Sequence, residues 1–332
     1  MDIYVPHYYK SFRCIADKCK ESCCIGWEID IDSDTLEMYS KLDGDLGKKL
    51  RANITVSEDG SDCFKLGENE RCPFLTENDL CELILSGGEE MLCDICRLHP
   101  RFINLMPKHT EMGIGLCCEE AARVILTDNE PFSLEKLGTD DETEIVEEPE
   151  DIFMQNARNV ILQFLEKNIS IPEKAGTLIK LGKLISEKLC NNDLSPVECI
   201  TPASHFPGDD LLGKLELIFS LESLNDRWKE VCLKIKTAVQ NAEEFTFDGH
   251  YREYTNLLKY YIFRYFTCSC DPLEAVTLAV FSACAAAIIS KASGLDITES
   301  ACLWSKETEY SAENTDMICG FSQELSQTSS FL

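Results

Sequence analysis

The chain has 332 residues, of which 44% are hydrophobic, a composition typical of folded globular proteins with one large domain or two ordinary ones. Acidic side chains outnumber basic ones by 59 to 31, which gives a formal net charge of −28 at pH 7. A nucleic-acid-binding surface needs Lys and Arg against the phosphates, so this charge argues against nucleic acid as a partner. It suits a cationic partner such as a lysine-bearing protein surface, although solubility alone explains it equally well.

The first residues, MDIYVPHYYKSF, contain no continuous apolar segment of the kind that marks a secretory signal peptide. The longest apolar stretch, residues 275–289, has 15 residues, whereas a helix that spans a bilayer needs about 20. We therefore expect a buried core helix at this stretch, no membrane partner and a cytoplasmic location.

Cysteine is the most informative residue type in this sequence. The chain has 19 cysteines, and eleven of them fall within residues 14–118. Cytosolic thiols stay reduced, so a dense pattern there predicts metal binding or catalysis rather than disulfides. The odd number points the same way, because one thiol would stay unpaired in a fully oxidised chain.

In the N-terminal half, one helix is predicted at DTLEMYSKL, with Asp34 as its N-cap and Glu37 three residues later. Its apolar side would continue through Leu36, Tyr39, Leu46, Leu50 and Ile54. Loop-forming sequences follow, namely SEDGSD, LGENERCP and LSGGEE. A region with so little regular structure cannot bury much apolar surface, so we expect bound metal to hold it together.

An acidic run separates the two halves of the chain. Residues 139–151, TDDETEIVEEPED, contain no basic residue. Repulsion between like charges keeps such a run extended, which predicts a linker. The predicted domains are therefore a cysteine-cluster metal-binding domain over 1–138, an acidic linker over 139–151 and a helical domain over 152–332.

The second half carries the apolar spacing of buried helix faces. Pro172 stands where the first turn of a helix tolerates proline. Helices are predicted around residues 153–165, 178–189, 228–239 and 254–265, from about Leu273, and through Met317, Phe321 and Leu325. The predicted fold class is mainly α, an irregular cysteine-rich N-terminal domain followed by a C-terminal helical bundle.

The N-terminal cysteines fall into short groups. In chain order they are Cys14, Cys19, Cys23 and Cys24; Cys63, Cys72 and Cys81; Cys93 and Cys96; Cys117 and Cys118. Thiolates are soft ligands that suit zinc or an iron–sulfur cluster. Structural zinc usually uses two close pairs, and only Cys93 and Cys96 form such a pair, so the spacing favours iron–sulfur without excluding zinc.

Two other interpretations of these residues are weaker. A catalytic cysteine needs a neighbouring base, and no Cys/His family signature is present. His99 follows the pair Cys93 and Cys96, but a turn residue before Pro100 is a better interpretation than a metal ligand.

The chain resembles the flagellin lysine-N-methylases, within the wider group of zinc- or iron-chelating cysteine-cluster proteins. The motifs that carry the resemblance are FRCIADKCKESCCIGWEI, ERCPFLTENDLCEL, LCDICRLHPRF, LCCEEAARVIL and WSKETEYSAEN. The resemblance implies that the metal ligands are Cys14, Cys19, Cys23, Cys24, Cys63, Cys72, Cys81, Cys93, Cys96 and Cys118. Cys117 is left out because relatives more often carry serine there.

The resemblance implies transfer of methyl groups from S-adenosylmethionine to lysine ε-amines of flagellin or another protein, with a 4Fe-4S cluster or zinc at the cysteines. Tyr310 stands where we expect histidine in relatives. No G-x-G-x-x-G follows a predicted strand, so a Rossmann-type cofactor site is not indicated, and no catalytic or cofactor-binding residue can be chosen. Two alternatives stay open: a non-enzymatic protein with a structural ion, whose helical domain docks a protein partner, and a metal carrier.

Overall fold

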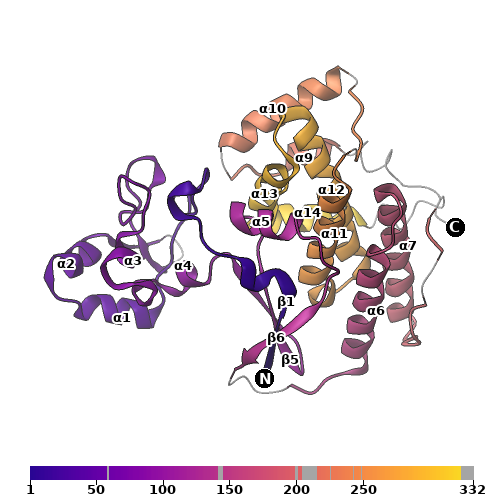
Figure 1. The fold of residues 1–332 in the computed structure, drawn as a ribbon, viewed down its shortest axis with the longest axis horizontal. Coiled ribbons are helices and arrows are strands. Elements are labelled where there is room, and N and C mark those ends of the chain that lie inside the picture. Colours follow the sequence, from indigo (N-terminus) through magenta and orange to yellow (C-terminus); the bar gives the residue numbers. More distant parts are fainter. Residues whose placement is uncertain are drawn as a thin grey trace. The chain divides into compact units, whose positions relative to one another are not determined.

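The computed structural model describes residues 1–57, 60–140, 145–198, 201–203, 215–224, 226–241, 243–247 and 249–322. It is mainly α, as predicted (Figure 1). By packing, the chain forms two compact units. The large unit comprises Met1–Phe12, Ile103–Cys117 and Ala121–Leu332, and the small unit comprises Arg13–Phe102 and Cys118–Glu120.

These units differ from the predicted domains in where two segments belong. Residues 1–12 and 103–117, which the sequence analysis placed in the cysteine-cluster domain, pack with the helices of the large unit. The predicted linker does not divide the units either, since both of its ends belong to the large unit; its residues 141–144 lie outside the described part of the chain. The physical reason is strand pairing between segments far apart in sequence.

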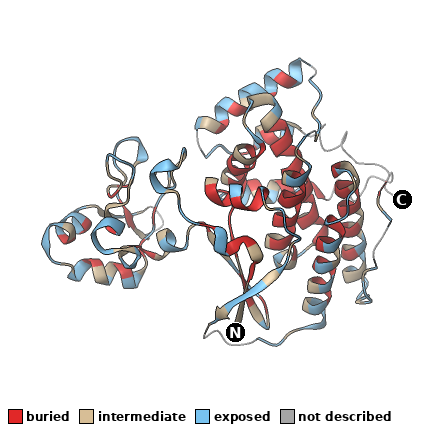
Figure 2. Cartoon of the chain, viewed as in Figure 1, coloured by how far each residue is buried: buried red, intermediate tan, exposed pale blue. Residues whose placement is uncertain are grey.

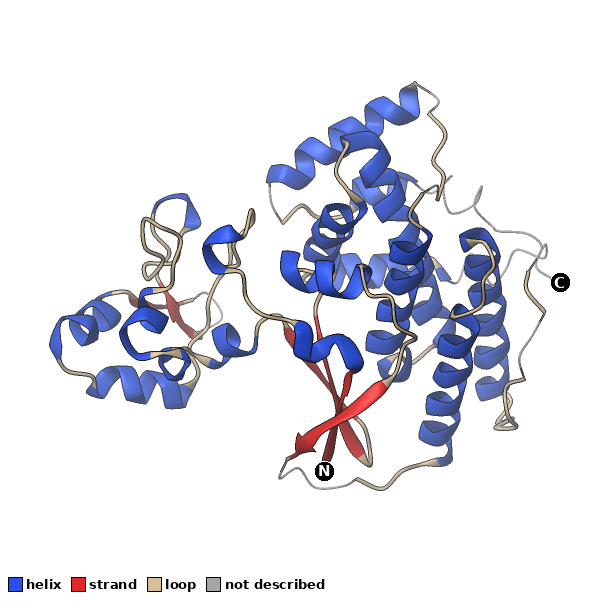
Figure 3. Cartoon of the chain, viewed as in Figure 1, coloured by secondary structure: helices blue, strands red, loops and turns tan. Residues whose placement is uncertain are grey.

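The sequence analysis did not predict these strands. They are β1 (Asp2–Pro6), β4 (Arg101–Leu105), β5 (His109–Ile114) and β6 (Leu134–Thr139), in the order β4-β5-β1-β6 (Figure 3). β1 runs parallel to β5, with Ile3 opposite Thr110, and antiparallel to β6, with Ile3 opposite Gly138. The N-terminal strand thus draws residues 103–117 and 134–139 into the large unit.

A buried ion pair joins this sheet to the helices. Glu111 of β5 is 0% exposed and Arg158 of α6 is 3% exposed, and two hydrogen bonds of 2.6 Å run from the guanidinium to the carboxylate. Burial by itself raises the pKa of Glu111, but hydrogen bonds from His109 and Arg158 outweigh it and hold that pKa below its usual value.

The helices from residue 119 onward confirm most of the predicted ones. They are α5 (Glu119–Leu126), α6 (Pro149–Leu165), α7 (Ile171–Cys190), α9 (Leu215–Ser220), α10 (Asp226–Gln240), α11 (Tyr251–Tyr265), α12 (Pro272–Ser293), α13 (Ile297–Thr308) and α14 (Ala312–Gly320). Pro172 does lie in the first turn of α7, behind a capping box made by Ser170 and Glu173. Helices α5, α9 and α13 were not predicted, and Leu325 lies outside the described residues.

Helix α12 is the core of the large unit (Figure 2). By length and composition it could cross a membrane, but 89% of its apolar window is buried inside the structure. The packing is tight: a Cβ on Gly182 of α7 would lie 2.3 Å from Val276 Cγ2. Trp304 Nε1 of α13 donates a hydrogen bond to Ser282 Oγ on the other side. These contacts agree with the predicted buried core helix.

The small unit has short elements. They are α1 (Ser33–Lys41), α2 (Gly44–Ala52), β2 (Ile54–Val56), β3 (Asp62–Phe64), α3 (Glu82–Gly87) and α4 (Asp94–Leu98). The predicted helix at DTLEMYSKL is α1, but its N-cap is Asp32, whose Oδ1 accepts from Thr35 N at 2.9 Å. Asp34 lies inside the first turn, where its charge still favours the positive end of the helix dipole.

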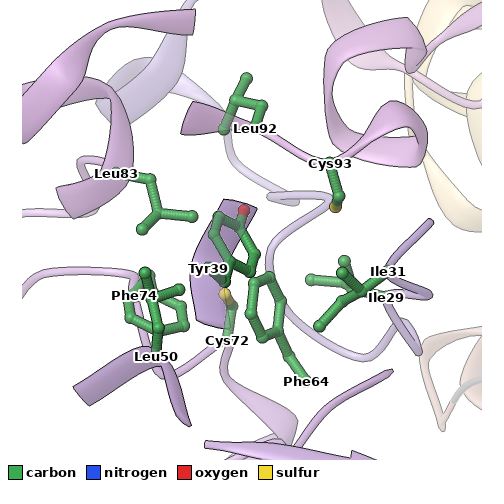
Figure 4. Packing of buried hydrophobic residues seen from close by; sticks show 10 residues of the cluster. All are labelled: Ile29, Ile31, Tyr39, Leu50, Phe64, Cys72, Phe74, Leu83, Leu92 and Cys93. Carbon is green, nitrogen blue, oxygen red and sulfur yellow. The ribbon is translucent and has the colours of Figure 1, made fainter. Parts of the chain in front are cut away.

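The expectation that this region buries little apolar surface was wrong. Ten buried side chains form one cluster (Figure 4): Ile29, Ile31, Tyr39, Leu50, Phe64, Cys72, Phe74, Leu83, Leu92 and Cys93. The ring of Phe64 packs against Phe74, with centroids 4.9 Å apart, and stacks on Tyr39 at 6.1 Å. Each fully buried large apolar side chain contributes about 1.5–3 kcal/mol, so apolar packing supports this unit as well.

Replacing Arg158 should destabilise the large unit strongly. In Arg158→Met the Glu111 carboxylate loses its buried counter-ion, which typically costs about 3–5 kcal/mol. The double variant Arg158→Met/Glu111→Met should lose less, because no uncompensated charge remains. Urea unfolding followed by far-ultraviolet circular dichroism measures both. A double variant less stable than Arg158→Met would contradict this account.

Candidate metal centre

All ten predicted ligands belong to the small unit. Cys14 to Cys96 lie within Arg13–Phe102, and Cys118 lies in the short segment Cys118–Glu120. Cys117, which was left out of the ligand set, belongs to the large unit. There its thiol lies 3.0 Å from Tyr310 Oη, and its carbonyl oxygen lies 3.4 Å from the Cys302 thiol.

Five thiols form what we call the central thiol group: Cys24, Cys72, Cys81, Cys93 and Cys96. They lie at or against the apolar cluster of the small unit. Backbone contacts bring their segments together, since Cys72 N donates to Cys24 O at 2.9 Å, and Cys81 forms an antiparallel bridge with Leu75. Cys93 is the N-cap residue of α4.

The charges of the central thiol group act on one another. The pKa of Cys72 is raised to about 12, mainly by burial and in part by charge on Cys24, Cys81 and Cys93. The pKa of Cys96 is raised, first by its hydrogen bond with Cys93, and the same hydrogen bond lowers the pKa of Cys93. The group therefore holds some thiolate charge but opposes full ionisation, as expected for acids that share a buried site.

Three more thiols form the outer thiol group: Cys14, Cys23 and Cys118. The pKa of Cys23 is raised, mainly by its hydrogen bond with Cys24, then by burial and by charge on its thiol neighbours. That hydrogen bond lowers the pKa of Cys24 to about 7. Lys20 N donates to Glu119 Oε2 at 2.8 Å, which fixes the segment of Cys118 beside the loop that carries Cys23.

The remaining two predicted ligands, Cys19 and Cys63, belong to neither thiol group. Cys19 donates to Glu21 O at 3.8 Å, one residue after a turn of 3₁₀ helix. Cys63 is buried in β3, opposite Thr55 of β2. His99 caps the C-terminal end of α4 before Pro100, as expected for a turn residue.

The chemistry of the central thiol group fits a soft metal, but its geometry is not that of a formed site. Among the described residues, no three or more Cys, His, Asp or Glu side chains are arranged so that they hold an ion. The fit rests on the donor atoms: soft sulfurs from four segments, with ionisations that oppose one another. A bound cation would relieve that opposition, because a coordinated thiol loses its proton outright.

Sequence reasoning assigned no role to the polar residues of WSKETEYSAEN, and the structure gives one to Glu309. Its Oε2 accepts from Arg264 Nη1 at 2.5 Å, Tyr260 Oη at 2.7 Å and Tyr265 Oη at 2.9 Å. Its Oε1 accepts from Ser305 Oγ at 2.6 Å. Both carboxylate oxygens thus accept hydrogen bonds. Glu309 therefore links α11 to α13 and is not available as a catalytic base. Nothing in the sequence indicated this role, because Lys306 and Glu307 are also charged residues at the same helix end.

Comparisons with known proteins give distant relatives. No protein-family model and no solved structure matches the chain. Over 140 residues, 39% of this chain, it is 26% identical to a lysine-N-methylase of Salmonella choleraesuis (strain SC-B67) and 25% identical to the flagellar biosynthetic protein FliU of Salmonella muenchen. The match spans 33% of that lysine-N-methylase and 79% of FliU. These names suggest a methylase-like function at low identity.

Asp32 should matter more to the candidate centre than Asp34. Its Oδ1 caps α1, and its Oδ2 accepts from Asp94 N at 2.9 Å, which ties α1 to the helix that carries Cys96. Asp32→Ala should cost about 1–2 kcal/mol and speed hydrogen exchange at amides of both helices. Asp34→Ala, an exposed change in the same turn, is the matched control. Equal exchange in the two variants would show that Asp32 does not tie these helices.

Proposed function

We propose that the protein is a lysine N-methyltransferase that transfers a methyl group from S-adenosylmethionine to the ε-amine of a lysine in flagellin or another protein. The similarity to proteins named lysine-N-methylase, and to one named a flagellar biosynthetic protein, carries this proposal. In the reaction the neutral amine nitrogen bonds to the methyl carbon, the carbon–sulfur bond breaks, and S-adenosylhomocysteine and one proton are released.

The proposed metal centre lies in the small unit. The central thiol group would supply most of its ligands, and the outer thiol group lies next to it through Cys23 and Cys24. A 4Fe-4S cluster bound by these thiols would supply iron chemistry in the small unit, whereas zinc would stabilise the fold of that unit. Cys24, Cys72, Cys93 and Cys96 are the first candidates because their charges act on one another.

Charge supports a protein substrate that carries lysine. The net charge of −28 attracts a cationic surface over long range and raises the rate of encounter. The target amine must lose its proton before it attacks, which needs a base or a site that lowers its pKa by burial. Tyr310, which stands where we expected histidine, is hydrogen-bonded to the Cys117 thiol, and burial raises its pKa. It therefore does not replace an imidazole base near neutral pH.

A second candidate function is a protein whose ion is only structural. The apolar cluster of the small unit favours it, because that cluster packs directly against Cys24, Cys81 and Cys96. In that case the thiols would bind an ion that strengthens an already folded unit, and the large unit would dock a partner. Metal content and methyl transfer separate the two functions.

Metal content should depend on the central thiol group. Purified without oxygen, the wild type should contain iron with sulfide, or zinc. Cys93→Ser and Cys96→Ser should each lose most of it, because each removes a sulfur ligand at the start of α4. Cys117→Ser is the matched control: it should keep the metal, because that thiol contacts Tyr310 in the large unit. Elemental analysis measures this, and a wild type without metal would rule out the centre.

The methyl-transfer activity should depend on the bound metal. With labelled S-adenosylmethionine and flagellin as acceptor, the wild type should label lysine, and Cys96→Ser should label at least about tenfold less, a loss of about 1.4 kcal/mol of transition-state stabilisation. Mass spectrometry of the acceptor identifies the modified residues. Metal-loaded wild type that labels no lysine-rich acceptor would leave the structural ion as the function.

A further inference from the structure

The large unit contains a pocket that neither the motifs nor the proposed metal centre uses. Its volume is about 490 Å³. Four segments line it: the loop after α5, the C-terminal end of α6, the first half of α7 and the N-terminal half of α11. The side chains that matter are Asp128, Glu166, Lys174, Tyr251, Glu253 and Lys259.

Lys174 is a buried cation on this pocket with neutral partners. It is 1% exposed. Its ammonium donates to Leu165 O at 2.6 Å and to Thr255 Oγ1 at 3.0 Å, and it lies 4.5 Å from the centre of the Tyr251 ring. The charge of Glu166 acts on this ammonium, but no carboxylate accepts a hydrogen bond from it. Burying an ammonium in this way costs free energy, so an anion at this place would be favourable.

A second lysine adds to the positive charge. Lys259, which is 7% exposed, lies 2.5 Å from Glu166 Oε1. The oxygen of Glu166 is shared, because it also accepts from Phe132 N at 3.0 Å. The charges of both ammonium groups thus act on one carboxylate, that of Glu166, which is itself exposed. Asp128, Glu130 and Glu253 lie on the same pocket and carry the opposite charge.

We propose that this pocket binds a small zwitterion, with the carboxylate of the ligand on Lys174 and Lys259 and its cationic end toward Asp128, Glu130 and Glu253. The identity of the ligand rests on the proposed function: S-adenosylmethionine carries a carboxylate, an amino group and a sulfonium. The ring of Tyr251, which is 39% exposed, offers a face on which an aromatic base can stack.

Calorimetric titration of the metal-loaded full chain tests this assignment. S-adenosylmethionine should bind, and methylthioadenosine, which lacks the amino-acid end, should bind at least about tenfold more weakly. Lys174→Met and Lys259→Met should each weaken S-adenosylmethionine binding about tenfold or more, without changing methylthioadenosine binding. Lys180→Met, on the same helix but not lining the pocket, is the control. Circular dichroism checks that each variant is folded.

The pH dependence gives a readout that a purely structural lysine would not show. The pKa of Lys174 is lowered to about 8, mainly by burial and in part by the charge of Lys259, while the charge of Glu166 opposes this shift. The other charged groups on the pocket are Asp128, Glu130, Arg252 and Glu253. Because the protonated ammonium binds the carboxylate, affinity should fall as pH rises through about 8. Lys174→Met should remove that fall.

These experiments distinguish a failure of the pocket assignment from a failure of the proposed methyltransferase function. Equal affinity for S-adenosylmethionine in wild type, Lys174→Met and Lys259→Met, or no binding to the wild type, overturns the assignment, and Lys174 then only caps the end of α6. If binding depends on both lysines but no acceptor is methylated, the pocket stands and the methyltransferase proposal fails. If both variants methylate the acceptor as well as the wild type does, the pocket assignment fails and the methyltransferase proposal stands.

Discussion

Thiolates that share a buried place repel one another, and this repulsion is the constraint on which the interpretation of the small unit depends. The apolar cluster around Tyr39, Phe64 and Phe74 holds the segments of Cys72 and Cys93 together. Burial then raises the pKa of Cys72, and the hydrogen bond between Cys93 and Cys96 gives most of the charge to one of the two sulfurs. The unit therefore gathers soft donors whose simultaneous ionisation is unfavourable unless a cation is bound.

Apolar packing and metal binding are two separate sources of stability for such a unit. We expected metal alone to hold it, because its sequence is rich in loop-forming residues. The structure shows why this was too simple: Leu50 from α2, Phe64 from β3 and Leu83 from α3 meet in one cluster although each element is short. An ion bound at the central thiol group would then fix the geometry of an assembled unit rather than create the unit, and its binding energy would add to that of the apolar cluster.

The sequence predicted the helices whose apolar spacing is visible within the segment itself. The apolar spacing over residues 254–265 marked α11, and the alanine-rich stretch marked α12, because a buried helix face repeats within the segment itself. The strands could not be found this way, since β1 acquires its partners more than 100 residues away. The cap of α1 was misplaced by two residues because Asp32 and Asp34 are equally good cap residues in sequence. For the candidate centre, the resemblance included Cys118 and left out Cys117, and the packing places these two adjacent residues in different units.

The buried charges of the large unit show why Lys174 needs a separate explanation. Arg158 faces Glu111, and Arg264 faces Glu309, so each of these guanidiniums has a carboxylate at hydrogen-bonding distance. Lys174 has a carbonyl, a hydroxyl and a ring instead. Glu166 acts on this ammonium through its charge, but it makes no hydrogen bond to it. Lys174 thus borders a pocket of about 490 Å³ and has only neutral hydrogen-bond partners within the chain. This arrangement suits a bound ligand that carries a negative charge.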